Sequence, residues 1–342
     1  MSIFIFRLVL DVFRLYSNPM LTDQTPEKPE KIAFLLLPGF SMLAFSAMLD
    51  PLRMANWLTG EPLYEWTLIS RDGGPVAAAN GIDVQVDHSI GSVQRLPTVI
   101  VVASYDHLDL ATPDILAFLR RWASFGSLLG ALDNGTFILA EAGLLDEYRA
   151  TAHWEMLETY VERYPHITFT QDLFVIDRDR ITAAGGTAGL DMMLTLLRLR
   201  HGPDLATKAA DEFVYARVRA PEETQKMALR DRLRGVNPRL IRAVEAMEQN
   251  IEDPVSTGRI AKAAGFSARE LERQFRKWLK TTPGAYYRNI RLDRARQLLR
   301  QTEMPVLDIG LRCGFSSAAH FSRAYSGRFG HPPRAERPTG VV

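Results

Sequence analysis

One short stretch combines the residue types and the spacing of a chemically active turn. Residues 129–143 have the sequence LGALDNGTFILAEAG, which predicts an apolar strand, an Asp-Asn-Gly turn and a helix. A sharp strand-to-helix turn lifts one side chain clear of a sheet, and α/β enzymes place nucleophiles there. Here that side chain is Asp133. Three roles stay open for it at this point: a catalytic acid, a carboxylate that binds a ligand, or a turn former.

A second group of polar residues recurs near the C-terminal end. The segment IAKAAGFSARELERQF (260–275) is repeated as IGLRCGFSSAAHFSRAY (309–325). Each copy predicts a short helix, a Gly-Phe-Ser turn and a second helix, the signature of a helix-turn-helix motif. In the first copy, Ser267 and Glu270 form a capping box that fixes where the second helix begins. The polar residues predicted to face outward from the two second helices are Arg269, Glu272, Arg273 and Arg276 in the first copy, and Ser317, His320, Ser322 and Arg323 in the second.

The segment between the two copies predicts one rigid connecting helix. Thr282 is suited to cap it and Pro283 to occupy its first position, so we expect a helix over 283–301 of about 28 Å. Such a helix could hold two recognition helices roughly one DNA turn (~34 Å) apart. Five arginines along it are expected to contact phosphates, which position a protein on DNA without specifying the sequence. They are Arg288, Arg291, Arg294, Arg296 and Arg300.

The charge of the chain is distributed unevenly. Residues 1–229 carry 19 Lys and Arg against 29 Asp and Glu, whereas residues 230–342 carry 22 against 11, so net charges of −10 and +11 make up the total of +1. This asymmetry indicates that the C-terminal part meets a polyanion. A basic helical bundle that binds another protein would look the same on charge alone. The duplicated motif favours double-stranded DNA.

Composition excludes several classes of protein. At 342 residues the chain is long enough for two domains. Its single cysteine, Cys313, excludes an intrachain disulfide and a cysteine-rich metal site, and its seven histidines show no metal-ligand spacing. We therefore expect no metal and no cofactor. No run of 18 apolar residues occurs, so we expect a cytoplasmic protein that does not span a membrane.

The elements that must position Asp133 alternate along the N-terminal part. Strands are expected at 32–37, 66–70, 99–102 and 128–132, helices at 43–57, 113–124, 135–143, 186–202 and 205–217, and a hairpin at 173–184. Strands that alternate with helices predict an open, mostly parallel sheet flanked by helices. The predicted fold class is therefore α/β, followed by an all-α domain with two helix-turn-helix motifs.

Residues 239–337 resemble the AraC/XylS-type DNA-binding domain along its whole length. The resemblance rests on IAKAAGFSARELERQF, YYRNIRLDRARQLL, LDIGLRCGFSSAAHFSRAYSGRFG and HPPRAER. It implies that Arg269, Glu272 and Arg273 of the first copy contact bases, as do the four outward-facing residues of the second copy, and that Arg276 contacts DNA. Gly310 and Arg312 depart from the family, which usually has small apolar residues there. Because glycine costs a helix about 1 kcal/mol relative to alanine, we expect the second motif to be the less rigid one.

Residues 31–200 resemble the ThiJ/PfpI (class I glutamine amidotransferase-like) domain. The matching stretches are FLLLPGFSMLAFSAMLDPLRMAN, SRDGGPVAAANGIDV, GALDNGTFILAEAGLLDEYRATAHWE and ITAAGGTAGLDMMLTLL. The whole chain thus resembles GlxA-type regulators, closest to those of carnitine, glycine betaine and amino-acid catabolism. The resemblance implies a transcriptional activator, a homodimer formed through the sensor domain, a small-molecule effector and contact with RNA polymerase.

The resemblance also bears on Asp133. Enzymes of this superfamily carry a cysteine at that position, and a carboxylate cannot replace a thiolate in acyl transfer without changing the mechanism. We therefore expect no enzyme but a ligand site beyond the carboxyl ends of the strands. A carboxylate with aromatic rings suits a cationic amine or betaine, which rings attract through cation–π contacts. The residues expected there are Phe40, Asp50, Tyr105, Asp133, Asn134, His153 and Trp154.

The expected organisation has four parts. Residues 1–30 form a flexible tail whose first 19 residues could precede a true start at Met20, and 31–218 form the sensor and dimerisation domain. A polar linker at 219–238 leads to the DNA-binding domain at 239–342. Two other functions stay open: an amidotransferase-fold hydrolase with an attached DNA-binding domain, and a DNA-binding protein that responds to no effector.

Overall fold

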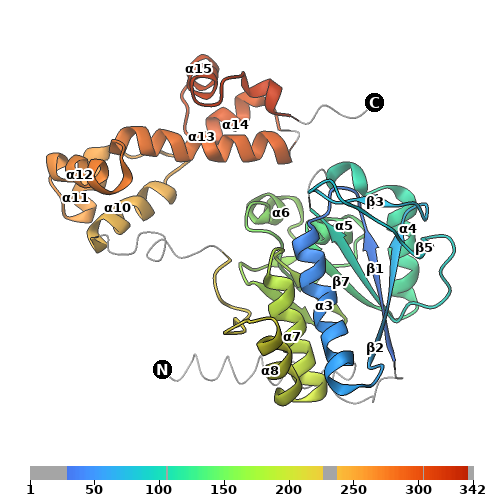
Figure 1. The fold of residues 1–342 in the computed structure, drawn as a ribbon. Coiled ribbons are helices and arrows are strands. Elements are labelled where there is room, and N and C mark those ends of the chain that lie inside the picture. The colour runs from blue at the N-terminus through green and yellow to red at the C-terminus, as the bar shows by residue number, and fades with distance from the viewer. Residues whose placement is uncertain (1–28, 105–106, 226–236, 303, 338–342) are drawn as a thin grey trace. The chain divides into compact units, whose positions relative to one another are not determined.

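The computed structural model of the chain describes residues 29–104, 107–225, 237–302 and 304–337. The chain divides into two compact units, Met1–Lys226 and Met227–Val342 (Figure 1). Nearly all of the predicted tail at 1–30 lies outside the described residues, as do residues 226–236 of the predicted linker. The rest of that predicted linker is described, and residues 219–225 belong to the first unit.

A seven-stranded sheet forms the centre of the first unit. Its strand order is β10-β11-β7-β6-β1-β2-β5, and every neighbouring pair is parallel except the hairpin β10–β11. The strands are β1 (Glu30–Leu36), β2 (Tyr64–Ser70), β5 (His88–Ser89), β6 (Thr98–Ala103), β7 (Leu128–Asp133), β10 (Phe174–Asp177) and β11 (Arg180–Ala183). Two small ribbons pair β3 (Val76–Ala77) with β4 (Asp83–Val84), and β8 (Arg149–Ala150) with β9 (Thr168–Phe169). The predicted open, mostly parallel sheet is confirmed.

Helices cover both faces of this sheet, as strand β1 shows most clearly. Its even-numbered residues from Ile32 to Leu36 pack in one apolar cluster, and its odd-numbered residues from Ala33 pack in the other. Successive side chains of a strand point to opposite faces, so a strand buried on both faces is apolar throughout. Helices α3 (Met42–Thr59), α7 (Ala188–His201) and α8 (Pro203–Glu212) cover the first face, and α4 (Pro113–Ser124), α5 (Gly135–Glu141) and α6 (Leu157–Arg163) cover the second (Figure 1). A 3₁₀ turn, η1 (His107–Leu110), precedes α4.

Helix α8 is shorter than the sequence predicts. We expected a helix over 205–217, but α8 ends at Glu212. Val214 has a φ of 52°, a left-handed conformation that a β-branched residue rarely adopts and that cannot continue a helix. The chain beyond it turns back over α7 instead, because Tyr215 and Arg219 hydrogen-bond to Asp191 on that helix.

The second unit is helical and is built along one long helix. Its elements are α10 (Pro238–Glu248), α11 (Thr257–Ala264), α12 (Ala268–Gln274), the π-helical turn η2 (Phe275–Leu279), α13 (Pro283–Gln301), α14 (Val306–Arg312), α15 (Ala318–Phe329) and η3 (Pro333–Glu336). Helix α13 has the predicted bounds, and Thr282 caps it by accepting a hydrogen bond from the Ala285 amide (3.2 Å). Tyr287 of α13 belongs to the apolar core of the first helix-turn-helix motif, and Leu292 to that of the second.

No helix in the described part of the chain is both long enough and apolar enough to cross a lipid bilayer.

Candidate nucleic-acid interface and ligand site

Helix α12 and the π-helical turn η2 present the first set of predicted DNA-binding residues. Ser267 caps the helix by accepting a hydrogen bond from the Glu270 amide (3.2 Å), and Leu271 is buried in the core. This fixed start and inward-facing apolar residue leave the predicted residues on the outer face. All four are exposed: Arg269, Glu272, Arg273 and Arg276. Arg276 pairs with Glu272 (2.8 Å), and an exposed pair of this kind holds its arginine only weakly.

Helix α15 presents the second set, with one change to the expected roles. Ser317 is the N-cap of α15 and accepts a hydrogen bond from the His320 amide (3.3 Å). It therefore does for α15 what Ser267 does for α12, and only its O–H remains to donate elsewhere. His320 and Arg323 are exposed, whereas Ser322 is half-buried. With both caps fixed 50 residues apart, Arg273 and Arg323 occupy equivalent positions on the two recognition helices.

The turns of the two motifs both depend on glycine. Gly265 and Gly314 have φ values of 76° and 72°, in the left-handed region that glycine adopts without strain. Glycine suits position 310 for a different reason, because a Cβ there would lie 3.0 Å from the ring of Phe321. The departure from the family pattern at this position therefore lets α15 pack closely on α14. Reduced rigidity of the second motif stays a prediction.

Arg291, Arg296 and Arg300 on α13 are each held by residues of the same unit. Arg291 donates to the Gly314 carbonyl (2.8 Å), and its guanidinium lies 4.7 Å from the centre of the Phe315 ring. Arg296 (2.9 Å) and Arg300 both pair with Glu336, whose side chain is only 4% exposed. The phosphate contacts predicted for these three arginines must therefore compete with internal partners. Arg288 is exposed, and it is the residue of this group that we expect to contact phosphate most simply.

Glu336 joins the closing turn of the unit to two helices. It accepts hydrogen bonds from Arg296 on α13 and from the Tyr325 hydroxyl on α15 (2.9 Å each). Burial raises the pKa of Glu336, but its hydrogen bonds with Arg296, Tyr325 and Arg300 outweigh burial and leave that pKa below its usual value. Glu336 therefore holds the second recognition helix against α13. No local pattern predicted this role, because the partners are 11 to 40 residues away.

In the first unit, the predicted elbow lies where strand β7 meets helix α5. Asp133 has a φ of 58°, which is uncommon for a residue other than glycine and marks a strained, over-determined turn. The turn is fixed on both sides: a Cβ at position 135 would lie 2.4 Å from the Val101 carbonyl oxygen, so only glycine fits there. The next residue, Asn134, donates to the Ser104 carbonyl and accepts from the Tyr160 hydroxyl (3.0 Å). Asp133 therefore does form the turn, but turn formation alone does not explain why its carboxyl group is placed where it is.

The electrostatics of Asp133 distinguish it from an ordinary turn residue. Burial raises the pKa of its carboxyl group from 3.8 to about 6. The charge of His153 and a hydrogen bond with Ser104 oppose this rise, and the charge of Glu155 adds to it. His153 lies 3.8 Å from Glu155 through its Nδ1 and stacks beside Trp154, with ring centres 5.3 Å apart. Asp133 is therefore a carboxylate whose charged form is costly unless a cation is nearby.

The structure gathers only some of the residues expected at this site. Asp133, Asn134 and His153 come together, and Trp154 lies beside His153. Asp50 is on α3, where it pairs with Arg53 (3.0 Å), and Tyr105 is outside the described residues.

Phe40, which we expected to contact the ligand, belongs to the core instead. Its ring is fully buried and packs edge-on against Phe45, with ring centres 5.7 Å apart, because the loop after β1 bridges to Ala78 and turns the ring into the core. It offers no exposed face to a ligand in this structure.

The structure brings three more residues close to Asp133. Ser104 follows β6, Tyr160 lies on α6, and a Cβ at Gly185 would lie 3.0 Å from Asp133. Ser104 and Gly185 come just after strands that flank β7, and the carboxyl ends of neighbouring parallel strands meet at one edge of a sheet. That position is the signal by which the sequence indicates both residues. Tyr160 carried no such signal.

These two units define a class of protein: an α/β domain with a strand-to-helix elbow, joined to a helical domain with two helix-turn-helix motifs. Comparison with protein families agrees on each part. Residues 30–199 match the DJ-1/PfpI family, and residues 260–338 match a helix-turn-helix domain.

Relatives match almost the whole chain. The HTH-type transcriptional regulator CdhR of Pseudomonas aeruginosa is 43% identical over 89% of this chain and 90% of its own length. The HTH-type transcriptional regulator GlxA of Rhizobium meliloti is 36% identical over 90% of this chain and 95% of its own length. The solved structure of an AraC family transcriptional regulator from Pseudomonas putida is 31% identical, with a TM-score of 0.51 over 54% of this chain and all of that one. The chain belongs to this family of HTH-type transcriptional regulators, and its helical unit is a DNA-binding domain.

Proposed function

We propose that this regulator is a transcriptional activator controlled by a small cationic metabolite bound at the elbow. The observation that carries the proposal is the state of Asp133, a carboxyl group in a strained turn whose pKa burial raises to about 6. An ionised carboxylate in such a place is stabilised by a bound cation, and the free energy released can change the conformation of the domain. An amine, a betaine or a basic amino acid supplies that charge.

The proposal includes a non-catalytic α/β domain. Acyl transfer in this fold needs a thiolate at the elbow, and this chain has a carboxylate there. An aspartate nucleophile would need a second group to activate water for hydrolysis of the ester. A hydrolase with an attached DNA-binding domain remains the alternative, and turnover by the purified protein that Asp133→Ala abolishes would establish it.

The partners follow from this arrangement. The promoter duplex binds to the helical unit, and two copies of the chain pair through their α/β domains, so that an effector can bias the placement of two DNA-binding units together. Activation implies contact with RNA polymerase, and all of these partners belong to the cytoplasm. Analytical ultracentrifugation of the full chain tests the dimer.

Thermal melting of the full chain tests the ligand site. We would measure the Tm with glycine betaine, carnitine, arginine and ethylamine, for the wild type, Asp133→Ala and the control Glu65→Ala, whose exposed carboxylate pairs with Lys31 at the amino end of β2. A ligand at 100 times its Kd adds about 2.7 kcal/mol of stability, which raises the Tm by several degrees. We expect one compound class to raise the Tm of the wild type and of the control but not of Asp133→Ala.

Two other results would contradict the proposal. A rise that survives Asp133→Ala would place the effector elsewhere. Promoter occupancy and transcription that no compound of the panel changes would support the second alternative, a DNA-binding protein that responds to no effector.

A further inference from the structure

The segment after α8 crosses back over the first unit before the chain continues toward the DNA-binding domain. We call residues 213–225 the strap. Its backbone is tied to the sheet where the Leu173 amide, just before β10, donates to the Pro221 carbonyl (2.7 Å). The sequence predicted most of this segment as a linker, but the structure makes it part of the α/β unit.

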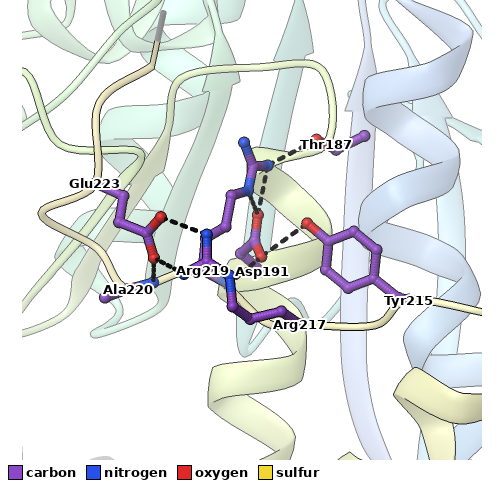
Figure 2. Close-up of polar contacts among 7 residues, drawn as sticks. All are labelled: Thr187, Asp191, Tyr215, Arg217, Arg219, Ala220 and Glu223. Atoms are coloured by element: carbon purple, nitrogen blue, oxygen red, sulfur yellow. Dashed lines mark hydrogen bonds and ion pairs between the residues drawn. The ribbon is translucent and has the colours of Figure 1, made fainter. Parts of the chain in front are cut away.

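One buried carboxylate anchors the middle of the strap. Asp191 on α7 is completely buried, and Figure 2 shows Tyr215 and Arg219 of the strap converging on it. The Tyr215 hydroxyl donates at 3.0 Å, and Arg219 donates through its amide (2.7 Å), its Nε (2.9 Å) and its Nη2 (2.6 Å). A buried charge is tolerated only when it is paired. The strap therefore cannot leave α7 without exposing or neutralising Asp191, so this part is fixed.

A second set of contacts shapes the turn that follows. Glu223 accepts two hydrogen bonds from Arg217 (2.6 and 2.8 Å) and one from the Ala220 amide (2.9 Å) (Figure 2). Arg217 is largely exposed to solvent, so this ion pair contributes less than the Asp191 contacts. The turn that this ion pair stabilises leads to Gln225, which contacts the loop after β8.

The last described residue of the strap, Gln225, is held less completely. Its Nε2 lies near three acceptors: the Thr151 hydroxyl (3.1 Å), the Ala152 carbonyl (3.1 Å) and the Asp172 carbonyl (2.9 Å). An amide nitrogen has only two hydrogens for these three oxygens. The Oε1 atom is buried and has no hydrogen-bond partner in the part of the chain that the structure describes. An unsatisfied buried acceptor weakens the docked state, so this end is the one that can release.

The loop that Gln225 contacts belongs to the elbow. Thr151 and Ala152 directly precede His153, whose charge acts on Asp133. The Thr151 carbonyl also accepts from the Thr136 hydroxyl on α5 (2.9 Å), the helix that begins at the elbow. One loop therefore contacts both the proposed ligand site and the end of the strap.

We propose that Gln225 is the positioning residue that couples the elbow to the segment leading to the DNA-binding domain. The inference rests on the proposed function of the elbow as a ligand site. A change of charge at Asp133 shifts the loop at 151–153, and that shift changes how firmly Gln225 is docked. Because Asp191 keeps the middle of the strap in place, only its end responds. Coupling of this kind is reciprocal, so release of Gln225 must also loosen the loop.

Hydrogen exchange of the full chain without effector tests this coupling. We would compare the wild type with Gln225→Glu, which replaces the donor by an acceptor, with Gln225→Met, which removes the polar group, and with the control Gln94→Glu at an exposed site. We expect both Gln225 variants to speed exchange of peptides covering 149–156 by about threefold or more. The control leaves those peptides unchanged. Exchange around Tyr215 and Arg219 also stays slow in all variants, because Asp191 still holds them.

The coupling from the elbow to the strap is tested with Asp133→Asn, which removes the charge at the elbow. We expect this variant to change exchange of the peptide covering 220–225, and to have no such effect in a Gln225→Glu background. Unchanged exchange at 149–156 in both Gln225 variants, or effects of the two sites that simply add, would overturn the proposal. These measurements need no effector. A failed search for a ligand would therefore count against the proposed function and leave this coupling test intact.

Discussion

The raised pKa of Asp133 predicts a particular dependence of stability on pH, which Asp133→Asn should remove. The pKa of this carboxyl group is about 6 in the folded protein against an ordinary 3.8. Each pKa unit corresponds to 1.36 kcal/mol, so the ionised group destabilises the fold by about 3 kcal/mol at full effect. The variant keeps the size of the side chain, and asparagine tolerates the left-handed backbone at this turn.

The direction follows from which state holds the proton more tightly. Well below pH 3.8 the group is protonated in both the folded and the unfolded chain, and it contributes nothing. As the pH rises from about 3 to about 7 the unfolded chain loses the proton first, so the stability of the wild type falls, and above about pH 7 the full cost applies. The cost is about 1 kcal/mol at pH 4.5 and about 3 kcal/mol at pH 7.5, because the folded form still holds most of its protons at the lower value.

Urea denaturation of both proteins at pH 4.5 and pH 7.5 measures this difference. We expect the stability of Asp133→Asn relative to the wild type to increase by about 2 kcal/mol between the two pH values. Taking the difference between the proteins cancels the titrating groups that do not interact with Asp133. Profiles that stay parallel within about 0.5 kcal/mol would refute a raised pKa at the elbow and with it the reasoning for a cation site.

Other predictions concern the DNA-binding unit. Gly314→Ala should destabilise it by about 2 kcal/mol or more and Gly265→Ala by less, measured by thermal melting, because a Cβ at 314 would lie 2.6 Å from the Ile251 carbonyl oxygen whereas a Cβ at 265 meets a flexible arginine end at 3.1 Å. Equal losses would contradict this packing. Arg273→Ala should cost about 1–3 kcal/mol at particular base pairs, and Arg288→Ala should weaken all sequences alike, as binding titrations would show. Glu336→Gln should lower stability by about 1–3 kcal/mol, and an unchanged melting temperature would mean that its arginine contacts are dispensable.

Local signals predicted the framework of this protein well. The sequence located the bounds of α13 because Thr282 and Pro283 are a cap and a first helical residue, whose effect is confined to one turn. The strands β1, β6 and β7 were found because each is a short apolar run, and their alternation with helices indicated the sheet. The elbow at Asp133 was found for the same reason: a strand, a turn and a helix are adjacent in sequence.

The errors and omissions all involve contacts between distant residues. Phe40 is of a residue type that often lines binding sites, and only its bridge to Ala78 shows that it belongs to the core. The polar segment at 219–225 has the composition of a linker, and only the buried Asp191, 28 residues before Arg219, shows that it is anchored. Glu336 is another such case. No pattern within a few residues can reveal pairings of this kind.

We expect the two equivalent recognition helices, held on one long helix, to contact DNA together. Selection of duplexes from a random library by the full-length protein tests it most directly, with Arg273→Ala and Arg323→Ala measured alongside. We expect two short sequence elements about 10 base pairs apart, one relaxed by each variant. A single enriched element that both variants relax, or no enrichment at low salt, would contradict it.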